Sequence, residues 1–485
     1  MAESQVKPGD MNLGNTLPNE AAESSSAPAL AQEDLTNTSF SKRVMNWFEK
    51  WLLVLVLGGF ISGILVASIS QPVIDQVDAT INMFMSLYDY VAPVAIFLIL
   101  SPSLARMFAT RRTGKFGILV LNWFAIRKIL ASLWAIIFVL IVFRIPILPQ
   151  GAVSMGDGLG QAFGSVGDMM LTSTYFWAMY AAIAVSLISI KVERLTRLLE
   201  SIMDRVEIMG GYLLPIMPIF MFGIGAYIYG LPDNVQEQVG LDAQGKSVLL
   251  DLDIWGWAIS PRTPSGMITI YVLGALLTAL ACMIWHSVFL FVARAYEPRF
   301  SITGYFKNYW IKVYPLLWAT SSEALATPLQ LYLTKKHAPW ISDSIRRFAI
   351  GVGSYMDING TIINVYILGA IVLLMLGLNI SVVELLMIVP IVFLISYGVP
   401  GIPGELVLFA GPMATMLNVP EPMMPIFLAV YLGIQLGLPD SFRTGNNSTD
   451  DYVQAIIVNA VYEKRFAAEQ GVTALEPATT EGSQS

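Results

Sequence analysis

The sequence has few of the residues on which disulfide-rich and metal-binding proteins depend. Its 485 residues include one cysteine, Cys282, and two histidines, and only 13% of the residues are charged. A single cysteine excludes an intramolecular disulfide, and with two histidines we expect no Cys/His metal site. The start of the chain lacks a basic region followed by an apolar one, so we expect no cleaved secretory signal.

Apolar residues make up most of the chain. They account for 55% of it, and the mean hydropathy is +0.64. We therefore expect a polytopic membrane protein rather than a large soluble core, with the lipid bilayer as its surroundings. The net charge of −7 lies largely in the tails, 1–38 and 467–485, which have the composition of disordered segments. We expect no nucleic-acid partner.

Hydropathy predicts eight transmembrane helices. Lys and Arg gather before the first, after the second, fourth and sixth, and after the eighth, whereas the loops 71–87 and 145–170 contain neither. Basic residues favour the cytoplasmic side, so both termini are expected in the cytoplasm, with the protein integral to the cytoplasmic or plasma membrane. The predicted spans are residues 51–70, 88–108, 117–143, 171–190, 208–229, 267–291, 348–376 and 424–461.

Two apolar segments, 309–333 and 381–420, do not fit as simple spans. Each has a polar, Gly/Pro/Ser-rich centre, TSSEALATP in the first and YGVPGIPGE in the second. Backbone leaves the helix at membrane depth only where protein or water satisfies its polar groups, so each segment is predicted to be a re-entrant pair of short helices. Basic residues flank the first, which we expect to open to the cytoplasm, and the second should enter from outside. Such opposed broken segments indicate a transporter site near the midplane.

The stretch DSFRTGNNSTDD, residues 440–451, places four ionisable groups inside the eighth span, which we read as one long helix interrupted at about mid-depth. Charges in the bilayer are costly, so such residues are functional candidates. A structural Asp–Arg pair is the alternative, but it does not account for the further polar residues beside it. At about 100° per residue, five side chains share one face: Asp440, Arg443, Thr444, Asn447 and Asp451.

Four ordered motifs in the C-terminal half resemble those of a known family. They are TSSEALATP in the first hairpin, DINGT in the seventh span, GIPGE at the second hairpin tip and DSFRTGNNSTDD in the eighth span. Over about residues 300–462, their order and separation are similar to those of the dicarboxylate/amino acid:cation symporters, which include glutamate and aspartate transporters.

The resemblance implies an all-α polytopic membrane protein with eight transmembrane helices, two opposed re-entrant helical hairpins and a homotrimeric assembly. It also implies a division of the chain into a scaffold and a mobile transport core. The expected parts are a disordered cytoplasmic tail at 1–40, spans one to six at 41–300, the transport core at 301–462 and a second disordered tail at 463–485.

By this resemblance, Arg443 would hold the side-chain carboxylate of an acidic substrate and Asp440 its ammonium group. The local chemistry agrees, because a guanidinium offers a bidentate fork to a carboxylate. The hairpin tips, with Ser321 and Ser322, would receive a second carboxylate, since helix N-termini suit anions. The implied substrate-binding residues are Ser321, Ser322, Thr361, Asp440, Arg443, Thr444 and Asn447.

The resemblance also implies a cation site and a gate, with no cofactor beyond the coupling ion, Na⁺ or H⁺. Asp451 and Asn447, with the carbonyl of Gly353, would form a sodium site, and the tip of the second hairpin would act as the gate. The implied cation-binding residues are Gly353, Asp357, Asn359, Asn447 and Asp451, and the implied gating residues are Gly401, Ile402, Pro403, Gly404 and Glu405.

Several residues depart from the family pattern. Where the family has Asn-x-Asp-Gly-Thr, this chain has Asp357 and Asn359 exchanged, and Glu323 and Glu405 replace small residues at the two tips. Asp450, off the shared face of the eighth span, is expected to be a solvated or capping acid.

Arg127 and Lys128 lie about ten residues into the third span, where the family has hydroxyl residues around a deep sodium ion. One of them is predicted to take that ion's place and pair with Asp357. Lys128 is favoured, because a compact ammonium better imitates a monovalent ion. In the alternative, the register is wrong and both bases anchor the span near a water-exposed rim.

These patterns predict a secondary active transporter, a cation-coupled symporter of an acidic amino acid or a C4-dicarboxylate that works by alternating access of a mobile unit. An ion channel or anion-conducting pore is the alternative, since broken helices also build filters. An intramembrane enzyme would need a nucleophile–base pair, and His286 and His337 are expected to be ordinary packing and loop residues, so no enzyme is predicted. The sequence leaves the substrate and the choice of sodium or proton open.

Overall fold

The computed structural model describes most of the chain between Ser39 and Ala467, and it is mostly helical, 82%. Contacts divide the chain after Lys50, and the side chains discussed below all lie in the unit that begins at Trp51. The described residues are 39–111, 115–150, 154, 156, 160, 171, 174–212, 216–239, 249–351, 353–378, 380–397, 407–417 and 419–467.

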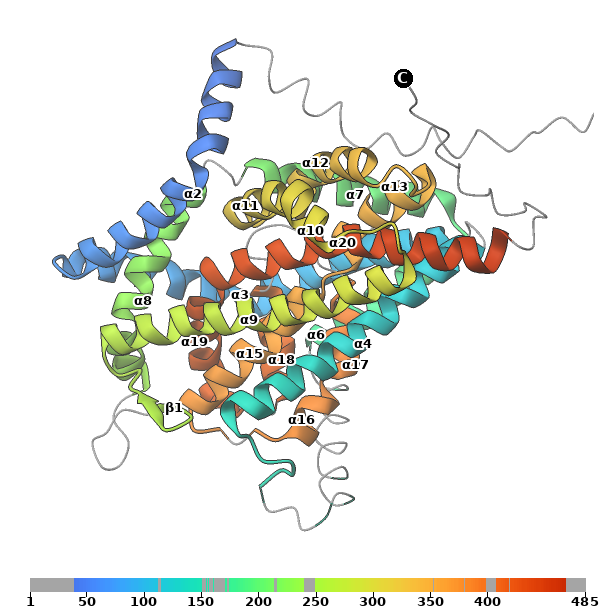
Figure 1. Ribbon diagram of the computed structural model, residues 1–485. Coiled ribbons are helices and arrows are strands. Elements are labelled where there is room, and N and C mark those ends of the chain that lie inside the picture. Colours follow the sequence, from blue (N-terminus) through green and yellow to red (C-terminus); the bar gives the residue numbers. More distant parts are fainter. Residues whose placement is uncertain are drawn as a thin grey trace, which may run out of the picture. The chain divides into compact units, whose positions relative to one another are not determined.

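Long helices form the N-terminal half (Figure 1). The prediction that 71–87 is a loop is wrong, because α3 begins at Gln71 and runs without a break through this segment. Pro72 suits the first turn of a helix, and no further Gly or Pro follows before Pro93. The predicted fifth span, 208–229, falls on two helices, the end of α7 and the start of α8. The helices are α2 (Ser39–Ala67), α3 (Gln71–Arg111), α4 (Lys115–Phe143), α6 (Thr174–Ser189), α7 (Glu193–Tyr212) and α8 (Met217–Val239).

The C-terminal half opens with a short antiparallel hairpin and continues with one long helix and many shorter ones. The elements are β1 (Leu252–Ile254), β2 (Trp257–Ile259), α9 (Pro264–Tyr296), α10 (Ile302–Tyr305), the π-helix η3 (Phe306–Trp310), α11 (Ile311–Thr320), α12 (Glu323–His337), α13 (Asp343–Gly351), α14 (Gly353–Met356), α15 (Asn359–Met375), α16 (Val382–Met387), α17 (Val389–Ile395), α18 (Val407–Met416), the 3-10 helix η4 (Glu421–Met423), α19 (Met424–Gln435), α20 (Leu438–Tyr462) and the π-helix η5 (Glu463–Ala467).

Several helices are suited to a bilayer. In the part of the chain that the structure describes, Gly117–Phe143 and Pro264–Tyr296 are each long and apolar enough to cross a membrane. Two bent pairs also qualify when joined, one bent by 119° near residue 70 and one by 64° near residue 437. Exposed apolar residues on α9 recur every three or four positions, as expected for a lipid-facing stripe: Val272, Leu276, Leu280, Ile284, Val288 and Phe291. The number of eight spans stays a prediction.

The first hairpin has the predicted break. Helix α11 ends at Thr320, Ser321 adopts a left-handed conformation with φ of 46°, and α12 begins at Glu323. In the second, α16 and α17 lie before the predicted tip and α18 follows it. The tip itself, with the predicted gating residues, lies outside the described residues, as 398–406.

The interruption of the eighth span lies elsewhere than predicted. Helices α19 and α20 meet at Leu436 and Gly437, and the whole polar stretch 440–451 lies inside α20. Gly437 has φ of 82°, which glycine adopts readily, and Pro439 fits the first turn of the new helix. The break therefore precedes the polar stretch, and the helical spacing used to assign one face to its side chains applies.

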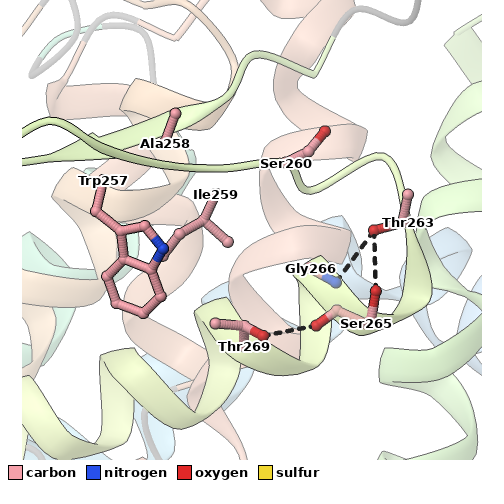
Figure 2. Close-up of a pocket in the computed structure, with 8 residues that line it drawn as sticks. All are labelled: Trp257, Ala258, Ile259, Ser260, Thr263, Ser265, Gly266 and Thr269. Atoms are coloured by element: carbon pink, nitrogen blue, oxygen red, sulfur yellow. Dashed lines mark hydrogen bonds between the residues drawn. The ribbon is translucent and has the colours of Figure 1, made fainter.

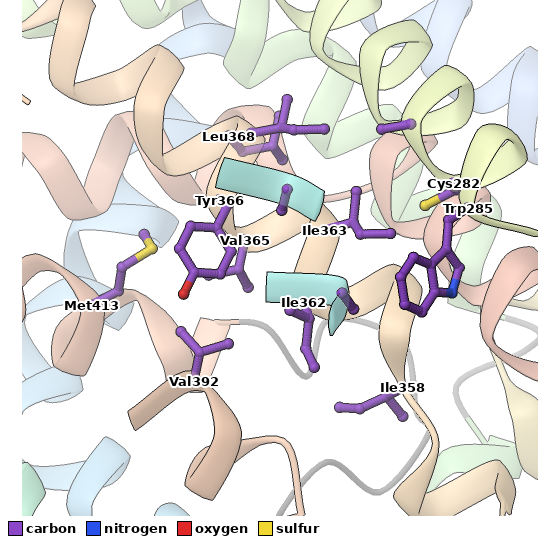
Figure 3. Packing of buried hydrophobic residues seen from close by; sticks show 14 of the residues in the cluster. Cys282, Trp285, Ile358, Ile362, Ile363, Val365, Tyr366, Leu368, Val392 and Met413 are labelled. Atoms are coloured by element: carbon purple, nitrogen blue, oxygen red, sulfur yellow. The ribbon is translucent and has the colours of Figure 1, made fainter. Parts of the chain in front are cut away.

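Helix α15 forms the centre of the core and is buried on nearly all sides (Figure 3). It packs against α4, α9, α19 and α20, and its apolar side chains point in every direction, as expected of a helix without a solvent face. A Cβ on Gly360 would lie 2.6 Å from the carbonyl oxygen of Arg443. The missing side chain thus lets the start of α15 approach the backbone of α20 and brings the DINGT motif to the polar face.

Candidate transport site

A cluster around Arg443 occupies the predicted polar face of α20. Its Nε donates to Asp440 Oδ1 at 2.8 Å, its Nη2 donates to the same oxygen, and its Nη1 donates to Thr361 Oγ1 at 2.6 Å. The guanidinium is thereby held between its own helix and the start of α15. All five side chains predicted to share this face are at most 2% exposed: Asp440, Arg443, Thr444, Asn447 and Asp451.

Asn447 connects three elements. Its Nδ2 donates to Thr361 Oγ1 and to Glu323 Oε1, both at 2.9 Å, and its Oδ1 accepts from the Thr361 N–H at 3.1 Å. The other Glu323 oxygen accepts from Ser448 Oγ at 3.2 Å. The tip of the first hairpin is thus bound to α20 through the carboxylate of Glu323, at one of the two tip positions where the chain departs from the family pattern.

The remaining predicted substrate residues lie nearby, and two of them, Thr444 and Ser322, bond to close neighbours in the sequence. Thr444 Oγ1 donates to the carbonyl of Asp440 at 2.8 Å, within its own helix. Ser321 and Ser441 pair their hydroxyl groups at 3.2 Å, and the Ser322 N–H donates to Thr320 Oγ1 at 3.2 Å. Ser321 and Ser441 therefore form a second contact between the hairpin tip and α20.

Asp451 has a different environment. It is fully buried, and among the described residues neither carboxylate oxygen has a hydrogen-bond partner. A Cβ on Gly353 would lie 2.3 Å from its Oδ1, so the carboxylate rests directly against that glycine. The charges of Asp357, Glu323 and Asp450 act on it unfavourably, whereas that of Arg127 is favourable. A buried anion without donors and with anionic neighbours needs a cation or a proton, and its oxygen atoms suit sodium.

Asp357 and Asn359, the exchanged pair of the DINGT motif, bond to each other. Asn359 Nδ2 donates to Asp357 Oδ1 at 2.6 Å, and Asn359 Oδ1 has no partner within the described ranges. The amide nitrogen of Asn359 therefore orients the acid, and the one oxygen of the pair without a partner in the described residues belongs to the amide.

The prediction that Lys128 pairs with Asp357 is wrong, because Arg127 does so. Arg127 Nη1 donates to Asp357 Oδ2, and Nη2 donates to Asp450 Oδ2 at 2.7 Å. Lys128 instead donates to the carbonyl and hydroxyl oxygens of Ser396, at 3.0 and 2.8 Å. Adjacent residues of a helix point about 100° apart, so the two bases face different neighbours. The alternative of a water-exposed rim is also wrong, since both are fully buried.

Asp450 is neither solvated nor a capping acid, contrary to prediction. It is fully buried, accepts from Trp285 Nε1 at 3.1 Å and from Arg127, and contacts His286 Nδ1. The other ring nitrogen of His286 lies 2.9 Å from the Tyr305 hydroxyl, so this histidine is not an ordinary packing residue either. The helical angle put Asp450 off the shared face correctly, but it could not show that α9 covers that side.

Residues 259–461 match the family model described as the sodium:dicarboxylate symporter family. The matched range is less than half of the chain, and it supports the predicted resemblance to the dicarboxylate/amino acid:cation symporters. The four motifs all lie inside the matched range, and the predicted resemblance is confirmed. The match and the apolar helices support a cation-coupled transporter and an integral membrane protein, which is consistent with the prediction that the chain is not an enzyme.

A hollow at the start of α9 is a separate feature (Figure 2). Its polar groups largely satisfy one another. Thr263 Oγ1 accepts from the Gly266 N–H at 3.1 Å and lies 3.3 Å from Ser265 Oγ, and Thr269 Oγ1 donates to the Ser265 carbonyl at 2.7 Å. The bond from Gly266 to Thr263 caps the helix. None of the predicted site residues lines the hollow.

Proposed function

We propose that this protein moves an acidic small molecule, an acidic amino acid or a C4-dicarboxylate, together with a cation by alternating access. The observation that carries the proposal is the buried Arg443, held by Asp440 and Thr361 beside Asn447. Burying a guanidinium in a membrane protein is costly, so such a residue is a candidate for a functional site. Its fork of N–H donors suits a carboxylate.

Binding is proposed to proceed by exchange at Arg443. Two of its nitrogens donate to one oxygen of Asp440, so an incoming carboxylate can take over this side of the fork. Asp440 then becomes an acceptor for the ammonium group of an amino acid. A solute without an ammonium group leaves the negative charge of Asp440 less well compensated. Asp440 should therefore distinguish amino acids from C4-dicarboxylates.

Coupling is proposed to occur at Asp451. Because its carboxylate is buried without a donor, a bound sodium ion or proton removes an unfavourable charge close to the Asn447 network. The tip of the first hairpin is bound to the same helix through Glu323 and through Ser321. The tip of the second hairpin, residues 401–405, is proposed to act as the gate. The protein is further proposed to assemble as a homotrimer with both termini in the cytoplasm.

Uptake into proteoliposomes tests the proposal, with imposed sodium or proton gradients and a panel of acidic solutes. Arg443→Ala should lose uptake of the acidic solute. Deleting a buried charge partner typically costs ~2–5 kcal/mol, which corresponds to a loss of at least about thirtyfold in the affinity for the solute. Arg262→Ala is the control, because the Arg262 side chain is 38% exposed and pairs loosely with Asp251. Wild-type affinity in Arg443→Ala would refute the placement of the carboxylate, and uptake indifferent to both gradients would refute coupling.

Asp440→Asn distinguishes the substrate classes in the same assay. If the solute is an amino acid, the variant should bind it much more weakly, because the acceptor for its ammonium is neutralised. If the solute is a C4-dicarboxylate, its binding should be spared or improved. Equal loss for both classes would show that Asp440 acts only by holding Arg443.

A further inference from the structure

Arg127 and two acids of the predicted transport core form a buried charged cluster that the proposed site does not use. Arg127 of α4 bonds to Asp357, before α15, and to Asp450 of α20, residues that are 230 and 323 positions away in the sequence. All three side chains are 0% exposed. One base therefore joins two acids from separate elements of the core.

Aromatic rings enclose the guanidinium of Arg127 on the side of α9. Its central carbon lies 4.4 Å from the ring centroid of Phe289 and 5.6 Å from that of Trp285. Cation–π contacts of this kind favour a permanent positive charge. An arginine stays protonated in proteins, so the charge is present in every state of the transporter.

A role in folding alone does not explain this arrangement. The desolvation of a buried ion pair often exceeds its Coulombic gain, and apolar residues of similar volume would stabilise the helix contact at least as well. What the guanidinium supplies, and an apolar side chain would not, is a fixed positive charge beside Asp357 and Asp450.

The charge of Lys128 also acts on Asp357, but Lys128 bonds to neither acid. Its ammonium bonds to Ser396 and lies 3.5 Å from the ring centroid of Tyr397, and within the described residues it forms no ion pair. The adjacent base, equally buried, is therefore a matched comparison for Arg127.

We propose that Arg127 is a built-in cation of the transport core, which occupies Asp357 and Asp450 so that neither acid binds a coupling ion. This inference rests on the proposed cation-coupled transport. Asp440 has Arg443 as its partner, whereas Asp451 has no hydrogen-bond donor among the described residues. The cation response of the symporter should consequently depend on Asp451, and the cluster of Arg127, Asp357 and Asp450 should add no ion to the coupling.

Chemical rescue tests the built-in cation. In Arg127→Ala, Asp357 and Asp450 lose the guanidinium, and Asp450 keeps only its contacts with Trp285 and His286. Solute binding should weaken by about a hundredfold or more. Added guanidinium, at concentrations far below the denaturing range, should restore most of the loss, and tetramethylammonium at equal ionic strength should not. Lys128→Ala should show no rescue by guanidinium. Wild-type binding in Arg127→Ala, a loss that no cation restores in the folded variant, or equal rescue of both variants would overturn the proposal.

A second variant decides the matter if Arg127→Ala does not fold. Asp451→Asn removes a carboxylate without hydrogen-bond partners in the described structure. This substitution leaves no buried partner unpaired, so we expect the variant to fold even if Arg127→Ala does not. The proposal requires that this variant lose the entire sodium or proton response of solute binding. A residual sodium response that disappears on further substitution of Asp357 or Asp450 by asparagine means that this acid takes an ion, and it overturns the built-in cation. Absence of any cation response in the wild type would instead refute the proposed function, so the two failures are distinguishable.

Discussion

Two neighbouring acids, Asp450 and Asp451, should respond in opposite ways to the same substitution. Both are fully buried in α20. Asp450 accepts from Arg127 and Trp285 and contacts His286, whereas Asp451 has no donor within the described residues. Replacing each by asparagine keeps the shape and removes one negative charge, so the change isolates the charge in each setting.

Asp450→Asn should lower the free energy of unfolding by about 3 kcal/mol. Deletion of one partner of a buried ion pair typically costs about 3–5 kcal/mol, and the lower end applies because asparagine can still accept from Trp285. The loss should be the same with and without a coupling cation, since Arg127 already compensates Asp450.

In the absence of cation, Asp451→Asn should be at least as stable as the wild type. The gain can reach about 3 kcal/mol, because the wild-type carboxylate is buried without donors and bears its full desolvation penalty. A cation present at about 100 times its dissociation constant stabilises the wild type by about 2.7 kcal/mol through linkage. Asp451→Asn should lack this gain.

Thermal unfolding in detergent measures both effects, with sodium replaced by N-methylglucamine at constant ionic strength and at two pH values. The reasoning fails if Asp451→Asn is as destabilised as Asp450→Asn in the absence of cation. It also fails if Asp451→Asn keeps the wild-type gain in unfolding temperature on adding sodium or lowering the pH.

Three further predictions concern single positions. Gly437→Ala should destabilise the fold by about 1–3 kcal/mol, measured by thermal unfolding, because its φ is 82° and a Cβ would lie 2.5 Å from a tyrosine hydroxyl; Gly223→Ala, with nothing within 4 Å, is the control. Gly353→Ala should abolish cation-dependent stabilisation, because the new methyl group would displace the Asp451 carboxylate. Hydrogen bonds from a neighbouring arginine lower the pKa of Glu297, so its stabilisation is present above its unfolded pKa and disappears as the pH falls through the lowered value. Unfolding curves of Glu297→Gln should lack this acid-side loss.

The sequence by itself determined the helical face of the site and the place of the first hairpin tip. Helical spacing assigns Asp440, Arg443 and Asn447 to one side of α20, and these side chains do meet in one bonded network with Thr361. The spacing succeeds because angles within a helix depend only on local geometry. The break at Ser321 was equally readable, since polar residues inside an apolar run rarely continue a membrane helix.

Only the tertiary structure decided which neighbour covers each face. Helical spacing alone predicts a solvated Asp450, yet α9 brings Trp285 and His286 against it. Lys128 was favoured on the chemistry of its ammonium, yet the rotation of α4 points Arg127 at the acids. Local periodicity gives the angle between two side chains of one helix, but the packing of whole helices sets which side chain of another helix stands opposite. That packing depends on the buried surfaces of all helices together, so it cannot be predicted from the sequence of any single segment.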